Sequence, residues 1–217
     1  MYSNTFLYYN TFMPKNDNLL FVGEIIKTVL LIVLFVFVIR NFVVQPFYVV
    51  GSSMEPTYQN NDYLIIDELT YHILAPKRGQ VVVLKHPTSE CDSFVKQGYT
   101  SKIGKTDPCK NYIKRIIGLP GETVNIRNGE VSVRTNGNDD FITLNEKYIE
   151  PNTPTLGSIE KKLAGDEYFV IGDNREPNAS SDSREWGALT RDHIIGKVWV
   201  RLLPGFELIK SPVYNKA

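Results

Sequence analysis

The sequence predicts a mostly β fold class: an antiparallel β-sheet domain with a small inserted β subdomain and one N-terminal transmembrane helix. Residues 19–40 form one nearly continuous apolar run, which is long enough for a membrane-spanning helix. Past residue 45 the chain changes to short alternating or β-branched runs that are separated by turn residues. Between two of these runs stands Asn128-Gly129, a strong signal for a two-residue hairpin turn.

The overall composition argues against nucleic-acid binding and excludes few other functions. The chain has 217 residues, with Lys and Arg together numbering 24 and Asp and Glu together also 24. A net charge of zero gives no reason to expect a nucleic-acid partner, because such proteins normally carry a basic excess. The two cysteines, Cys91 and Cys109, lack the spacing of a zinc site although His86 is near, so we expect no metal and no cofactor.

The N-terminal part divides into a flexible tail, residues 1–18, and a transmembrane anchor, residues 19–40. Twenty-one helical residues span about 31 Å, close to the thickness of the hydrocarbon core of a bilayer. A cleavable signal peptide is disfavoured because no small-x-small site follows Arg40. A buried core helix is disfavoured because the run is apolar on all sides. The few charges that flank the run do not fix its orientation.

The body after the anchor consists of predicted short strands, which favour a barrel or sandwich-like antiparallel sheet. The runs are QPFYVV, DYLIID, GQVVVLK, YIKRIIG, ETVNIR, GEVSVRT, FITL, EYFVIGD and KVWVRLL. Helical periodicity is scarce here. Residues 68–74 and 158–163 are expected to form short helical turns at most.

A serine-rich turn, Gly51-Ser52-Ser53, follows the strand-like QPFYVV and could project a hydroxyl from rigid backbone. A serine nucleophile needs a base. The three histidines, at positions 72, 86 and 193, lie outside any motif and are expected to be surface or loop residues. A Ser-His-Asp triad therefore has little support, whereas a Ser-Lys pair remains open.

The lysine of such a pair would come from the apolar strand Tyr112–Gly118. If this strand alternates, Lys114 shares one face with Tyr112, and Arg115 lies on the other face, so one of the two charges must point inward. A desolvated lysine can lose its proton, whereas arginine cannot. To act as a base near neutral pH, the pKa of Lys114 must fall by about 2–3 units. A solvated edge-strand lysine is the alternative.

A third block, Gly172-Asp173-Asn174-Arg175 with Asp182-Ser183-Arg184, is dense in charge directly after an apolar strand. Its main expected role is a structural turn braced by ion pairs.

These blocks, taken in order from Gln45 to Leu203, resemble the bacterial type I signal peptidase family. The resemblance implies that Ser53 is the nucleophile and Lys114 the general base, and that the charged blocks brace the site. The bracing residues would be Asp173, Arg175, Asp182 and Arg184. The resemblance also implies a serine that orients the lysine. Because the third block is two residues longer between Arg175 and Asp182 than is usual in the family, either Ser180 or Asn178 could occupy this position. We prefer Ser180.

The implied activity is removal of signal peptides from preproteins through an acyl-enzyme. The implied oxyanion donor is the Ser53 backbone N–H, without a side-chain donor because Gly51 stands two residues earlier. The substrate would lie beside Phe47–Val50, with small-x-small specificity. The expected substrate-binding residues are Phe47, Val49, Met54 and Ile113. The partners would be preprotein signal peptides and the lipid bilayer, with the catalytic domain on the outer side of a bacterial cytoplasmic membrane.

The same resemblance suggests the domain boundaries. Residues 41–124 and 166–217 would form the catalytic β domain, residues 125–165 the small inserted second domain, and residues 89–110 a Cys-containing insert. With this stretch outside the cytoplasm, Cys91 and Cys109 could form a disulfide or remain two unrelated thiols.

Two alternatives differ from this interpretation. A self-cleaving repressor also uses Ser-Lys chemistry on a β fold, but it would need a DNA-binding helical module in place of the anchor. The alternative without enzyme activity is a catalytically inactive, membrane-tethered β-domain that binds a partner.

Overall fold

The computed structural model describes residues 17–42, 44–96, 108–135, 137, 140–212 and 214. Its helical elements are α1 (Asp17–Phe42), α2 (Leu69–Ile73), α3 (Ser89–Lys96), α4 (Ser183–Trp186) and the 3-10 turn η1 (Arg191–His193). Its strands are β1 (Val44–Tyr48), β2 (Tyr63–Asp67), β3 (Val81–Lys85), β4 (Asn111–Gly118), β5 (Thr123–Arg127), β6 (Glu130–Arg134), β7 (Ile142–Thr143), β8 (Ile159–Lys162), β9 (Glu167–Ile171), β10 (Leu189–Thr190), β11 (Ile194–Leu203) and β12 (Glu207–Leu208).

Helix α1 is the predicted apolar helix. Its 26 residues include an 18-residue window, Leu20–Phe37, whose mean hydropathy is 2.5. None of this window is buried against protein, so the core-helix alternative finds no support in the structure. By length and composition the helix can cross a membrane. The chain therefore has an N-terminal apolar helix of the expected kind, two residues longer at each end than residues 19–40.

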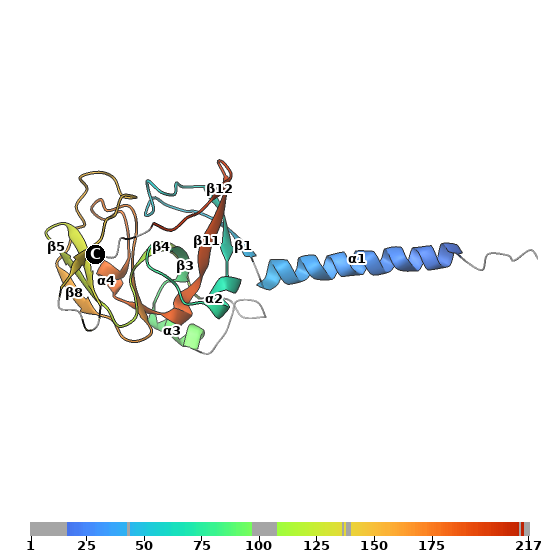
Figure 1. The fold of residues 1–217 in the computed structure, drawn as a ribbon, viewed down its shortest axis with the longest axis horizontal. Helices are drawn as coiled ribbons and strands as arrows, with labels where there is room; N and C mark the ends of the chain where they lie inside the picture. Colours follow the sequence, from blue (N-terminus) through green and yellow to red (C-terminus); the bar gives the residue numbers. More distant parts are fainter. Residues whose placement is uncertain are drawn as a thin grey trace, which may run out of the picture. The chain divides into compact units, whose positions relative to one another are not determined.

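The body, which begins after α1, contains an antiparallel sheet of eight strands (Figure 1). The strand order is β1-β2-β11-β3-β4-β9-β10, and β12 pairs with β11. Strand β1 lies at one edge of this path and pairs only with β2 among the described strands. The predicted mostly β, antiparallel fold class is confirmed.

A second sheet has the order β7-β6-β5-β8, and Figure 1 shows β5 and β8 at the opposite side of the body from β1. The hairpin between β5 and β6 turns at Asn128 (φ 54°) and Gly129 (φ 83°), as its sequence predicts. The helical turn expected at residues 158–163 is wrong. This segment is β8, which pairs with β5 from Ile159 to Lys162, because a partner strand outweighs weak local propensity.

The larger sheet is packed on both faces, which explains the apolar character of its central strands. Val81 and Val83 of β3 belong to one core cluster, which also contains Met54 and Leu64. The alternate residues of β3, Val82 and Leu84, belong to a second core cluster. A third cluster fills the space under the smaller sheet and reaches Ile117 of β4, so the two sheets share apolar contacts.

Cys91, on α3, forms a disulfide with Cys109 just before β4. Of the two possibilities that the sequence leaves open, the structure has the bonded one. Helix α3 was not predicted from the sequence.

Candidate functional site

The turn that carries Ser53 is held by hydrogen bonds from both sides. Gly51 has φ 95°, a conformation that favours glycine, and its N–H donates to Asn60 Oδ1 over 2.9 Å. Asn174 donates through Nδ2 to the Ser52 carbonyl (3.0 Å) and through its backbone N–H to the Ser53 carbonyl (3.1 Å). The serine side chain is therefore presented from backbone that is fixed between two loops.

Lys114, from the middle of β4, reaches this serine directly. Its Nζ lies 2.7 Å from Ser53 Oγ and donates to the Ile113 carbonyl over 2.9 Å. The lysine residue is only 3% exposed. Burial lowers the pKa of Lys114 to about 8, while Asp182 and Asp173 oppose part of that shift. The structure thus brings together the two residues that the sequence predicts as nucleophile and base.

Arg115, the next residue on β4, is also buried. The sequence suggested that one of the two charges points inward, whereas in the structure both are buried. Arg115 Nε donates to Asp173 Oδ1 over 2.7 Å, and its Nη2 donates to Oδ2 over 2.5 Å. Thr57 Oγ1 donates to the same Oδ2 over 2.5 Å. Asp173 therefore joins β4 to the loop that follows Ser53, and its paired charge makes the burial of Arg115 tolerable.

Asp182 occupies the N-cap position of α4 and collects several donors. Arg184 binds both carboxylate oxygens through Nε and Nη2, each over 2.8 Å, and the Gly172 N–H donates to Oδ2 over 3.0 Å. Burial alone would raise the pKa of this carboxyl, but the bonds from Arg184, Gly172 and Ser180 hold it below its usual range. Asp182 is thus a buried anion within the electrostatic surroundings of Lys114.

Ser180 and Asn178 differ in their surroundings. Ser180 Oγ donates to Asp182 Oδ2 over 2.7 Å. A Cβ added to Gly172 would overlap both Ser180 Oγ and the Ser53 carbonyl oxygen, so Ser180 approaches the nucleophile turn closely. Asn178 has φ 61° in an exposed turn. Its left-handed backbone is typical of a turn residue.

Arg175 is the bracing residue whose partners the sequence did not reveal. Its side chain is fully buried and pairs with Glu146, whose Oε1 lies 2.5 Å from Nη2. Arg175 also binds Thr155 Oγ1 and donates through Nε to the Gly172 carbonyl over 2.8 Å. Glu146 and Thr155 lie between β7 and β8, so this cation links the second sheet to the turn beside Ser53. No motif marked Glu146.

A cleft of about 500 Å³ opens at Ser53 and Lys114. Three of the four expected substrate-binding residues, Phe47, Val49 and Ile113, line it. Met54 is fully buried, belongs to the core cluster with Val49, and is not part of the lining. The lining also includes Tyr48, from the stretch expected beside the substrate, and Tyr112, together with Lys110 and Ser181, which sequence reasoning did not single out.

The histidines lie outside this cleft lining. The expectation of surface or loop positions is wrong for His193, which is 4% exposed at the end of η1. His193 Nε2 lies 3.3 Å from Asp92 and Nδ1 lies 3.2 Å from the Lys85 carbonyl. Among the described residues no His, Cys, Asp and Glu cluster could hold a metal ion.

Comparison with known proteins gives consistent results. The family model described as "Signal peptidase, peptidase S26" matches residues 22–203. A signal peptidase I of Leptolyngbya laminosa is 38% identical over 88% of this chain and 83% of its own length. A probable signal peptidase I-2 of Synechocystis is 38% identical over 83% of this chain and 73% of its own. A signal peptidase I of Bacillus amyloliquefaciens is 32% identical over 85% and 90%.

Proposed function

This chain belongs to the signal peptidase family, peptidase S26, and we propose that it cleaves signal peptides with Ser53 as nucleophile and Lys114 as general base. The family membership supports a peptidase that removes signal peptides. The observation that carries the finer proposal is the 2.7 Å contact between Lys114 Nζ and Ser53 Oγ, both of which line the cleft. A nucleophile within hydrogen-bond reach of its base is the geometry that covalent catalysis needs.

Proton transfer starts from neutral Lys114. In that form the amine accepts the hydroxyl proton of Ser53 as the oxygen attacks the substrate carbonyl. A pKa of about 8 leaves about a tenth of the Lys114 side chains neutral at pH 7. This fraction is enough for a general base and is far larger than the neutral fraction of an exposed lysine. The apolar wall supplied by Ile113 and its neighbours keeps the lysine desolvated.

The negative charge that forms on the substrate oxygen needs a donor. Within the described part of the chain the Ser53 N–H has no acceptor, and the turn that carries it is fixed by Asn174 and Asn60. A preorganised backbone N–H of this kind stabilises a tetrahedral intermediate without rearrangement. Gly51 offers no side-chain donor, so the backbone carries this role.

The preprotein segment would bind as an added strand. Strand β1 lies at the edge of the sheet and runs into the cleft, so the backbone groups on its outer side can pair with an extended peptide. Phe47 and Ile113 would then border shallow pockets that favour small residues. Met54 would act from beneath the surface, by filling the core under Val49.

When the scissile C–N bond breaks, Lys114 gives the proton it took from Ser53 to the leaving amine, which departs as the new N-terminus of the exported protein. The lysine is then neutral again and takes a proton from the water molecule that hydrolyses the ester on Ser53. The apolar helix α1 would hold the enzyme in the same bilayer as the signal peptide, with the catalytic body on the outer side of the bacterial cytoplasmic membrane. On this proposal residues 41–124 and 166–217 form the catalytic part, and residues 125–165 the inserted domain.

The test uses the full chain in maltoside micelles with a model preprotein that carries an Ala-x-Ala site. Wild type should cut after the site, and Ser53→Ala and Lys114→Ala should each lose at least about a thousandfold in rate. Ser52→Ala and Lys161→Ala are matched controls on an exposed neighbouring serine and an exposed lysine of β8, and should keep activity. Cleavage that survives in either catalytic variant would refute the assignment. No cleavage by wild type would favour an inactive binding domain.

A further inference from the structure

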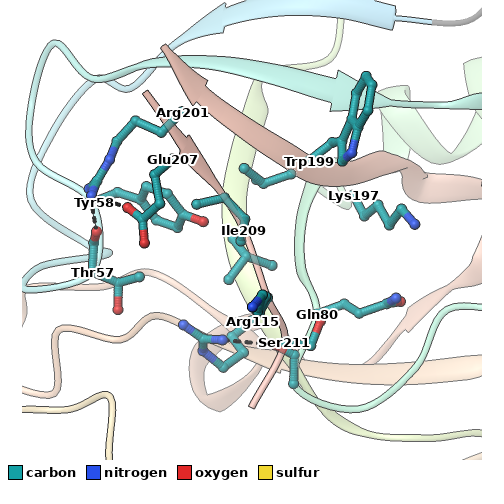
Figure 2. Close-up of a pocket in the computed structure, with 14 residues that line it drawn as sticks. Thr57, Tyr58, Gln80, Arg115, Lys197, Trp199, Arg201, Glu207, Ile209 and Ser211 are labelled. Carbon is teal, nitrogen blue, oxygen red and sulfur yellow. Dashed lines mark hydrogen bonds and ion pairs between the residues drawn. The ribbon is translucent and has the colours of Figure 1, made fainter. Parts of the chain in front are cut away.

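A second cavity, of about 360 Å³, lies on the body away from the Ser53 cleft, with which it shares no lining residue. We call it the hairpin pocket because much of its lining comes from β11, β12 and the segment that follows them (Figure 2). Its lining residues are Thr57, Tyr58, Gly79, Gln80, Val81, Arg115, Lys197, Val198, Trp199, Arg201, Glu207, Ile209, Lys210 and Ser211.

The lining is rich in positive charge. Four cationic side chains, Arg115, Lys197, Arg201 and Lys210, face a single acidic one, Glu207. Three of the cations have carboxylate partners: Asp173 for Arg115, Asp67 for Lys197, and Glu207 with Asp62 for Arg201. Of these carboxylate partners only Glu207 lines the pocket itself. Lys210 is exposed and has no ion pair with any described residue.

Two donors in this lining lack a partner. The Tyr58 hydroxyl and Arg201 Nε are buried and bond to no described residue. Tyr58 is 0% exposed, and burial raises the pKa of its hydroxyl, which therefore stays protonated. In Figure 2 this hydroxyl points toward Ile209 and the middle of the pocket. An unpaired buried hydroxyl is costly, and one aimed into a cationic cavity calls for an acceptor.

We propose that the hairpin pocket binds a phosphate group, as a phospholipid headgroup or as free phosphate. A phosphate oxygen can accept from Tyr58 once the half-buried Ile209 side chain moves aside, while Lys210, which has no ion pair with any described residue, supplies charge. The surroundings suit an amphiphile, because Trp199 on the lining is 48% exposed and Phe206 and Leu208 of the same hairpin are 72% and 54% exposed.

The test measures binding by tryptophan fluorescence, independently of peptidase activity. Trp199 lines the pocket and the only other tryptophan, Trp186, does not. The full chain in maltoside micelles is titrated with inorganic phosphate at constant ionic strength, or with micelles that contain phosphatidylglycerol or a phosphate-free glycolipid. Saturable change with phosphate alone would assign free phosphate. Saturable change with phosphatidylglycerol, but with neither free phosphate nor glycolipid, would assign the headgroup.

Variants decide whether the response comes from this pocket. Tyr58→Phe removes only an unpaired hydroxyl, so the fold should be kept, and the apparent affinity should fall roughly tenfold or more. Lys210→Gln should weaken binding a few-fold, and Lys161→Gln, on an exposed strand of the other sheet, should not change it. No saturable response to either phosphate source, or an unchanged affinity in Tyr58→Phe, would overturn the proposal.

Discussion

The pH dependence of cleavage follows directly from the burial of Lys114. Only the neutral amine can take the Ser53 proton, and the pKa of about 8 sets how much of it exists at each pH. The neutral fraction is about one tenth at pH 7, one half at pH 8 and nine tenths at pH 9. The value of kcat/KM should therefore rise about tenfold from pH 7 to pH 9 and level off above that.

The assay follows cleavage of a model preprotein at low substrate concentration, with a substrate that has no group titrating in this range. Lys114→Arg is the matched variant, since arginine keeps the charge but cannot lose its proton, and it should be inactive at every pH tested. A flat profile for wild type, a midpoint near 6.5, or activity that climbs only near 10.4 would contradict a buried Lys114 as the base. Those outcomes would indicate a different base or a solvated lysine.

Three further predictions concern stability and support of the site. Lys114→Met should raise the free energy of unfolding, measured by urea, by up to about 3 kcal/mol below pH 8. The gain should shrink as pH rises toward 10.5, because the lowered pKa penalises the charged form only in the folded protein. Glu146→Gln leaves Arg175 as an unpaired buried charge, so the free energy of unfolding should fall by about 3–5 kcal/mol and kcat should fall as well. Glu150→Gln, which changes an exposed carboxylate, should alter neither quantity. Replacing Cys91 and Cys109 by serine opens a loop with a sequence separation of 18 and should cost about 3 kcal/mol, and an unchanged melting curve would contradict this.

Much of the fold was predictable because its signals are local. Alternation in the strand runs and the Asn128-Gly129 turn identify the antiparallel pairs, and the apolar run identifies α1. The segment at residues 158–163 was misjudged because β8 is mostly exposed and its charged sequence shows no strand period. Its conformation is set by pairing with β5, a partner that the local sequence does not show.

The candidate site was predictable where a motif marked it and not elsewhere. Ser53 and Lys114 lie 61 residues apart, yet resemblance to a family places both, and the structure brings them into contact. Glu146 carries no such mark, because its role arises only where Arg175, 29 residues later, is buried against it. Alternation along β4 suggested one inward charge, but a carboxylate on a distant loop, Asp173, allows Arg115 to be buried beside Lys114.

The role of Ser53 as the nucleophile is tested best by identifying the residue that becomes acylated. The full chain would be mixed with an activated ester of a short Ala-x-Ala peptide, quenched in acid and mapped by mass spectrometry after digestion. We expect one peptidyl adduct, on Ser53, that forms in wild type and not in Lys114→Ala. An adduct on another residue, or turnover of the ester by wild type without any adduct on Ser53, would contradict this assignment.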